Sequence, residues 1–182
     1  MKRINLVIIF ILYLAIHTSN IVVGQTRKFE VDFNKKIKLH IETSDFDSLK
    51  HKITRTSING WSAVYQIDGQ LVFGTDWGIP DTKLDKMILT IGNDKIKLDV
   101  STMYNPWIGN YCNAHYFELK PIEGGYLLIA NFSDGAASYI TEWKIIKDKS
   151  VRTMISVDEG IISRFLSGNN KDKKQAEFKG LK

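Results

Sequence analysis

Apolar and charged residues alternate along much of this chain. Three segments show the pattern most clearly, with apolar residues at Phe29, Val31 and Phe33, at Ile37, Leu39 and Ile41, and at Ile96, Leu98 and Val100. Successive side chains of a strand point to opposite faces of a sheet, so this pattern places one face on a core and the other in water. It predicts antiparallel strands.

Short turn sequences separate the apolar runs. They are Asp68-Gly69, Gly92-Asn93-Asp94, Glu123-Gly124-Gly125 and Lys147-Asp148-Lys149. Glycine and aspartate readily adopt the backbone conformations that hairpin turns require. The chain is therefore predicted to be mainly β, an antiparallel meander of about ten short strands. Such a meander closes into a barrel or forms a two-sheet sandwich to bury its apolar face.

Helical signals are few. Asp158 can cap a short C-terminal helix that carries an apolar stripe at Ile161, Ile162, Phe165 and Leu166, and Gly168 follows this stripe. A helical turn is also predicted over 81–87, where Leu84 and Met87 could share a face, and a weaker one over 45–50.

The first 24 residues have the pattern of a secretory signal peptide. Lys2 and Arg3 precede an apolar run over 4–16, and a polar break over 17–20 leads to Gly24. A spanning helix needs about 20 apolar residues in succession, so cleavage after Gly24 is favoured over retention as an anchor. We expect a periplasmic or extracellular protein that has no stable membrane anchor once cleavage exposes Gln25.

The remaining 158 residues fit one β-rich domain over 25–168 and a lysine-rich tail over 169–182 that we expect to be disordered. The net charge of +5 comes from the two ends of the chain. Without Lys2, Arg3 and the tail, 18 basic side chains face 18 acidic ones. A nucleic-acid-binding domain concentrates positive charge on its folded face, so this charge balance argues against a nucleic-acid partner.

Cys112 is the single cysteine and cannot form an internal disulfide. It lies three residues before His115. One such pair is too few ligands for zinc, which takes three or four. The sequence therefore predicts no metal site and no cofactor.

Three segments interrupt the alternation with aromatic residues beside Gly, Asn and Asp. They cover 74–80, 103–109 and 131–139. Such residues are common in recognition surfaces, where rigid aromatic area is combined with adaptable polar groups. The candidate binding residues are Asp76, Trp77, Tyr104, Asn105, Trp107, Asp134, Ser138 and Tyr139. Each also has a purely structural explanation, as a turn cap or as core filler. Asn131 additionally begins an Asn-Phe-Ser glycosylation sequon.

The sequence lacks a recognisable catalytic motif, and Ser133 does not lie in a Gly-x-Ser-x-Gly turn. We therefore assign no catalytic residue and expect a binding or inhibitory module that recognises a protein or a carbohydrate. One alternative is a small exported hydrolase that uses Asp76, Asp134 and His115. The other is a lipocalin-like carrier of an apolar ligand. The binding module requires the three loops at one end of the sheet, whereas the hydrolase requires His115 within about 3 Å of a carboxylate.

Overall fold

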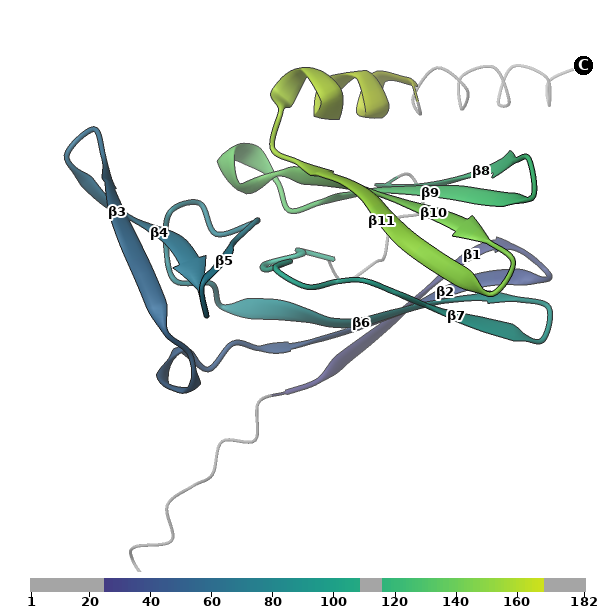
Figure 1. Ribbon diagram of the computed structural model, residues 1–182, viewed down its shortest axis with the longest axis horizontal. Coiled ribbons are helices and arrows are strands. Elements are labelled where there is room, and N and C mark those ends of the chain that lie inside the picture. The colour runs from purple at the N-terminus through teal and green to yellow at the C-terminus, as the bar shows by residue number, and fades with distance from the viewer. Residues whose placement is uncertain (1–24, 109–115, 169–182) are drawn as a thin grey trace, which may run out of the picture.

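The structure, a computed structural model, describes residues 25–108 and 116–168. The predicted signal peptide, the lysine-rich tail, Cys112 and His115 lie outside these ranges. The described residues form eleven strands in three antiparallel sheets (Figure 1). The prediction of a mainly β chain is confirmed.

Each sheet is named here by its position in the chain. The N-terminal sheet has the order β1-β2-β6-β7, formed by Arg27–Asn34, Ile37–Asp45, Thr82–Ile91 and Asp94–Leu98. The C-terminal sheet has the order β11-β10-β9-β8, formed by Lys149–Ser156, Tyr139–Ile146, Gly125–Phe132 and Phe117–Ile122. The accessory sheet has the order β3-β4-β5, formed by Ile53–Ile58, Trp61–Ile67 and Gln70–Leu71.

The two larger sheets form a sandwich around one core. Alternate residues of both sheets point inward, including Leu39, Met87, Leu128 and Trp143, all fully buried. Burial of a large apolar side chain stabilises the fold by about 1.5–3 kcal/mol. The indole N–H of Trp143 keeps a hydrogen-bond partner inside the core, because it donates to the carbonyl of Asp99 at 2.8 Å.

The sandwich does not close into a barrel. Its sheets approach each other along β7 and β11, where side chains make the connections. Ser150 donates to the carbonyl of Lys97 at 2.6 Å, and Arg152 donates to the carbonyl of Ser101 at 2.6 Å. Of the two architectures that the alternation allowed, the structure is consistent with the sandwich.

All four predicted hairpin turns are present, and the strands follow one another as a simple meander within the C-terminal sheet and within the accessory sheet. In the N-terminal sheet β2 pairs with β6. Residues 46–81 leave this sheet after β2, form the accessory sheet and return to β6. The prediction of one continuous meander was wrong, because a hairpin signal specifies only the pairing of adjacent strands.

The predicted helical turn over 81–87 is also wrong, since residues 82–87 form the first part of β6. Opposite β6, Glu42 pairs with Lys86 while Thr43 pairs with Leu84, which leaves Asp85 as an extra residue in a β-bulge. The bulge turns both Leu84 and Met87 toward the core. Two apolar residues three positions apart, a spacing typical of a helix, can therefore face the same side of a strand when a bulge lies between them.

The other helical predictions fared better. A 3-10 turn covers Ser48–Lys50 within the predicted 45–50 segment. The C-terminal helix covers 159–168, and Asp158 caps it by accepting from the backbone N–H of Ile161 at 3.0 Å. Asn131, the sequon residue, is only 5% exposed, so the folded protein does not present it for glycosylation.

Candidate functional site

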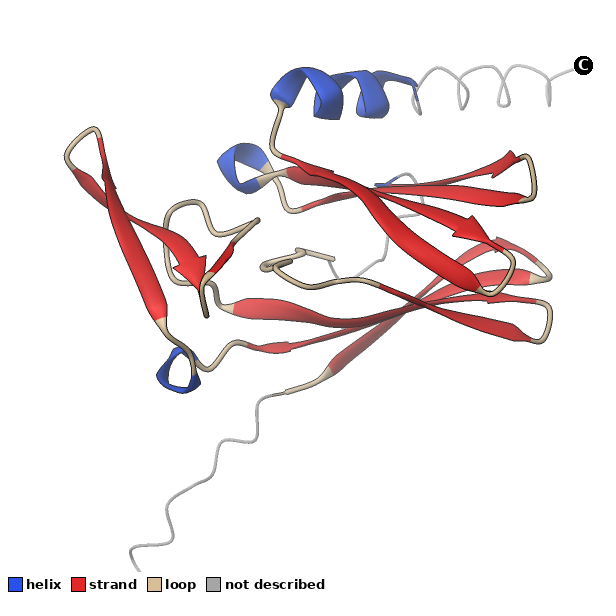
Figure 2. Ribbon diagram, in the orientation of Figure 1, coloured by secondary structure: helices blue, strands red, loops and turns tan. Residues whose placement is uncertain are grey.

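The three aromatic loops lie at the same end of the sandwich. The excursion over 46–81, the connection after β7 and the loop over 133–138 all follow strands that run toward this end (Figure 1). The turns of the β1–β2, β6–β7, β8–β9 and β10–β11 hairpins lie at the opposite end of the sandwich. The 3-10 turns Ser48–Lys50 and Gly135–Ala137 also lie at the loop end (Figure 2). The arrangement that a binding surface requires is therefore present.

The loop over 103–108 is the centre of this end, and the first loop is bonded to it. Phe73 donates to the carbonyl of Thr102 at 3.1 Å, and Tyr104 donates back to the carbonyl of Phe73 at 3.0 Å. The next residue, Gly74, is buried with a φ of +84° against the carbonyl of Tyr104. The two loops form one unit.

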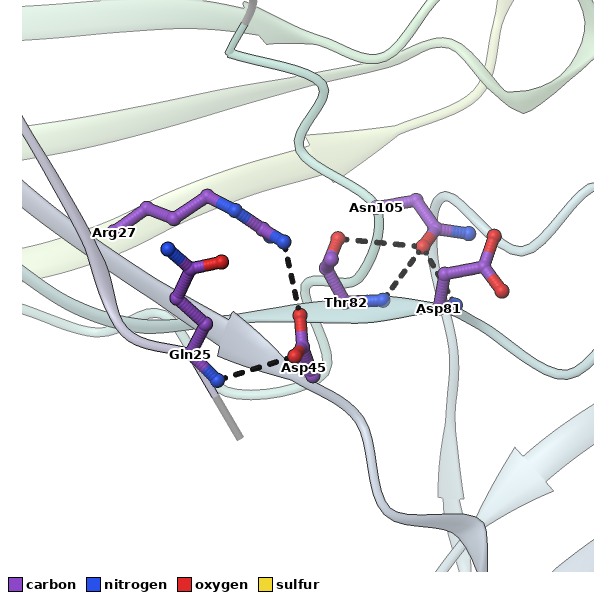
Figure 3. Close-up of polar contacts among 6 residues, drawn as sticks. All are labelled: Gln25, Arg27, Asp45, Asp81, Thr82 and Asn105. Atoms are coloured by element: carbon purple, nitrogen blue, oxygen red, sulfur yellow. Dashed lines mark hydrogen bonds and ion pairs between the residues drawn. The ribbon is translucent and has the colours of Figure 1, made fainter. Parts of the chain in front are cut away.

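Asn105 uses its side-chain amide to hold this unit to β6. Its Oδ1 accepts from the backbone N–H groups of Asp81 and Thr82, both at 3.0 Å (Figure 3). Its Nδ2 donates to the carbonyl of Gly74 at 2.9 Å. Both ends of the amide bind protein groups, so Asn105 shapes the site from within.

The third loop is attached to the same central loop. The backbone N–H of Ser133 donates to the carbonyl of Pro106 at 3.1 Å, and the hydroxyl of Tyr139 donates to the carbonyl of Tyr104 at 3.1 Å. Tyr139 is fully buried, which raises its pKa well above the ordinary value of 10.0. Like Asn105, it supports the loops from inside.

The remaining candidate residues face solvent to different degrees. Trp107 is 65% exposed and Trp77 is 46% exposed, and Asp76 and Asp134 are accessible as well. Tyr104 and Ser138 are half-buried. The structure thus divides the eight predicted residues into six that are accessible from outside and two that build the loops.

A second group of exposed aromatic residues lies on the accessory sheet, and sequence reasoning missed it. Trp61 is 72% exposed and Tyr65 is 48% exposed, both on β4. A signal for this hairpin was present, because Asn59-Gly60 lies between Ile58 and Trp61 and both turn residues have positive φ angles, 51° and 82°. The sheet is joined to the first loop, since Val64 donates to the carbonyl of Trp77 at 2.8 Å.

A histidine–aspartate pair, also missed, lies at the base of the accessory sheet. Nδ1 of His51 lies 2.6 Å from Oδ2 of Asp68, and the His51 ring stacks on Phe46 with centroids 4.7 Å apart. The hydrogen bond from His51, together with one from the backbone of Lys52, lowers the pKa of the Asp68 carboxyl. Partial burial and the negative charge of Asp68 raise the pKa of Tyr104.

A surface cleft of about 420 Å³ lies beside Trp107. Arg27 and Asp81 supply charged groups to its lining, and Phe29 supplies an apolar one. An exposed indole beside a carboxylate and a guanidinium can stack on one face of a small polar ligand and hydrogen-bond its edge.

The hydrolase alternative depends on His115, which lies outside the described residues. Within 25–108 and 116–168, no group of three or more His, Cys, Asp or Glu side chains is placed to hold a metal ion. No helix in the same ranges is long and apolar enough to cross a membrane.

Comparison of the chain with family models, with curated proteins and with solved structures gives no match. The geometry of this end of the sandwich therefore carries the functional argument.

Proposed function

We propose that this chain is an exported binding module that recognises a protein partner through exposed tryptophans at the loop end of its sandwich. One observation carries the proposal: three of the four tryptophans, Trp61, Trp77 and Trp107, are exposed, and only Trp143 lies in the core.

Exposed tryptophans suit protein recognition for an energetic reason. An indole can bury roughly 150–250 Å² of surface on binding while losing little conformational freedom. Residues of this kind are enriched among those whose truncation to alanine costs about 2 kcal/mol or more of binding free energy. Trp107 lies on the central loop, Trp77 lies on the first loop, which is bonded to it, and Trp61 lies on the sheet joined to Trp77.

The loops are held by hydrogen bonds before any partner arrives. Asn105, Gly74 and Tyr139 fasten the three segments to one another and to β6. A preformed surface loses less entropy on binding than a mobile one, so more of the contact energy appears as affinity. This arrangement supports a binding function for loops that lack a recognisable catalytic motif.

Export is supported by the amino-acid pattern of residues 1–24, which favours the periplasm or the outside of the cell as the protein's location. A carrier of an apolar ligand is less well supported. It would need an internal chamber, whereas the inward-facing side chains of both sheets pack against one another in a single cluster.

Carbohydrate is the second candidate ligand, favoured by the cleft beside Trp107. An oligosaccharide could stack on Trp107 and hydrogen-bond to Arg27 and Asp81, all of which line the cleft. Trp61 lies on the separate accessory sheet, so its truncation would leave such binding unchanged.

Site-specific photo-crosslinking tests the protein-partner proposal. A photoreactive phenylalanine analogue replaces Trp77 or Trp107, and a matched protein carries it at Asn93, in a tight turn at the opposite end. Illumination in the envelope fraction and culture medium of the producing cell should join a protein to the first two positions and leave Asn93 unlinked. Equal crosslinking at all three positions, or none at any, would refute the proposal.

A panel of defined oligosaccharides, followed by tryptophan fluorescence, separates the two ligands. Saturable binding that Trp107→Ala abolishes and Trp61→Ala preserves would replace the protein partner with a carbohydrate. Loss of a crosslinked protein partner in both variants, with no response to the oligosaccharides, would support the protein interface. Each variant is first compared with the parent by circular dichroism, so that loss of fold is not mistaken for loss of binding.

A further inference from the structure

The first described residue, Gln25, is held by a carboxylate at the end of the neighbouring strand. Its backbone nitrogen lies 3.1 Å from Oδ2 of Asp45, and the guanidinium of Arg27 lies 3.1 Å from Oδ1 of the same residue. Figure 3 shows both donors converging on Asp45. Asp45 therefore already has one cationic partner and one neutral N–H partner.

The position of Asp45 follows from the register of the sheet. Arg27 pairs with Thr43 in the β1–β2 ladder, so Gln25, two residues earlier, lies opposite Asp45, two residues later. β1 is the edge strand of the N-terminal sheet. A strand end at such an edge frays readily unless something holds it. The contacts of Asp45 hold this end to β2.

We propose that the Gly24–Gln25 bond is a processing site and that the ammonium group released on Gln25 forms an ion pair with Asp45. A signal peptidase adds one water molecule to this amide. The C–N bond breaks, Gly24 keeps the new carboxylate, and the nitrogen of Gln25 becomes a protonated amine. The neutral donor at 3.1 Å from Asp45 thereby becomes a second cation beside Arg27. The proposal rests on the export part of the proposed function and is independent of the binding surface.

The ion pair has a chemical consequence for the new terminus. An N-terminal glutamine cyclises when its free amine attacks its own side-chain carbonyl, which releases ammonia and forms a lactam. Only the unprotonated amine can attack. A neighbouring carboxylate favours the protonated form and so raises the pKa of the amine. Asp45 should therefore keep the terminus charged and slow its cyclisation.

The expected size of the effect of Asp45 on the Gln25 amine follows from the solvent exposure of the two side chains. Asp45 and Arg27 have side-chain exposures of 42% and 43%, so the pair is screened by solvent. An exposed ion pair of this kind raises the pKa of the Gln25 amine only modestly above its ordinary value. Near neutral pH the unprotonated fraction, and with it the cyclisation rate, should be about threefold lower than without Asp45.

The first experiment locates the cut. The full chain, with residues 1–24, is produced in a secreting host, and the exported product is analysed by N-terminal sequencing and intact mass. A product that begins at Gln25, in its open or cyclised form, supports the proposal. A product that begins elsewhere, or that still carries residues 1–24, overturns it. Neither result bears on the crosslinks at Trp77 and Trp107, which can be tested on protein that already begins at Gln25.

The second experiment tests the ion pair on protein released with a free Gln25 amine from a cleavable fusion. NMR titration gives the pKa of the amine, and mass spectrometry follows the loss of ammonia over time. Asp45→Asn should lower the amine pKa and speed cyclisation about threefold. Equal pKa values and equal rates in the parent and in Asp45→Asn would overturn the proposal.

Two controls make this comparison specific. Asp47→Asn removes a nearby carboxylate that pairs with Lys50, and it should leave both readouts unchanged. Arg27→Gln removes the competing cation while Asp45 stays, and the upward shift of the amine pKa should persist. If Asp45→Asn no longer changes the amine pKa or the cyclisation rate in a protein that already carries Arg27→Gln, the effect belongs to Arg27 and the proposed ion pair is wrong.

Discussion

Replacement of Gly74 by alanine tests the junction on which the candidate site depends. Gly74 has a φ of +84°, and a Cβ built on it would overlap the backbone carbonyl oxygen of Tyr104 and lie 2.7 Å from the Tyr139 ring. The first of these neighbours is backbone and the second is a fully buried ring. Neither can rotate away as an exposed flexible side chain would.

Two costs add in this variant. A side chain in the left-handed region costs about 1–2 kcal/mol, and forcing extra volume into a packed site costs about 1–3 kcal/mol. The sum is roughly 2–5 kcal/mol of unfolding free energy. For a domain of this size that corresponds to a fall in Tm of about 4–20 °C.

Gly69 offers the matched control. It has a nearly equal φ of +80°, yet a Cβ there would meet nothing within 4 Å. Gly69→Ala should therefore show the conformational cost alone, about 1–2 kcal/mol. Urea unfolding of both variants, followed by tryptophan fluorescence, gives the difference. If Gly74→Ala is no less stable than Gly69→Ala, the close approach of the first loop to Tyr104 is refuted.

Three further predictions concern single side chains. Asn105→Ala should destabilise the protein by about 1–3 kcal/mol in urea unfolding, because it leaves backbone groups of the loop junction without a partner; an unchanged midpoint would contradict this role. Asp158→Ala removes the cap of the C-terminal helix and should cost about 0.5–2 kcal/mol, seen as faster amide exchange in 161–164 with exchange in β9 unaltered. The pKa of Asp68 is lowered mainly by its hydrogen bond with His51, so its charged form stabilises the fold above the unfolded pKa and this contribution disappears as pH falls through the lower folded value. Asp68→Asn should thus be less stable than the parent at neutral pH, and the difference should shrink in acid as the pH falls below about 3.9; a constant difference across the pH range would count against the pair.

The predictions made from turn residues were confirmed. The four hairpins were predicted from Gly, Asp and Asn near positions where the backbone takes positive φ, and Asp68, Gly92, Gly124 and Lys147 do so. The polar strand β3 was not predicted. Its outer residues, 55–58, are all exposed, so no alternation marked it. Its pairing with β4 depends on backbone hydrogen bonds, which any residue type can make and which the amino-acid sequence therefore does not reveal.

The three loops of the candidate site were predicted from the sequence, but which of their side chains face solvent and which support the loops from inside was not. Glycine and aromatic residues located the three loops, and antiparallel strand direction brought them to one end. Which side chain points inward depends on contacts between distant segments, such as that of Tyr139 with Tyr104, 35 residues apart. Asn105 and Trp107 lie two residues apart in the same loop. The side chain of Asn105 is hydrogen-bonded to backbone groups, whereas that of Trp107 faces solvent.

The departure of residues 46–81 between β2 and β6 has a consequence for how the chain folds. Pairs such as β6 with β7 and β10 with β11 form across a turn, whereas β2 and β6 meet only after the whole excursion has been closed into a loop. Closing that loop costs conformational entropy before the β2–β6 pairing can stabilise the chain. Contacts between residues far apart in the sequence therefore slow folding. We therefore expect the C-terminal sheet to form early, and the joining of β2 to β6 to set the rate. The accessory sheet and the first loop bonded to it would then take their final positions only in that late step.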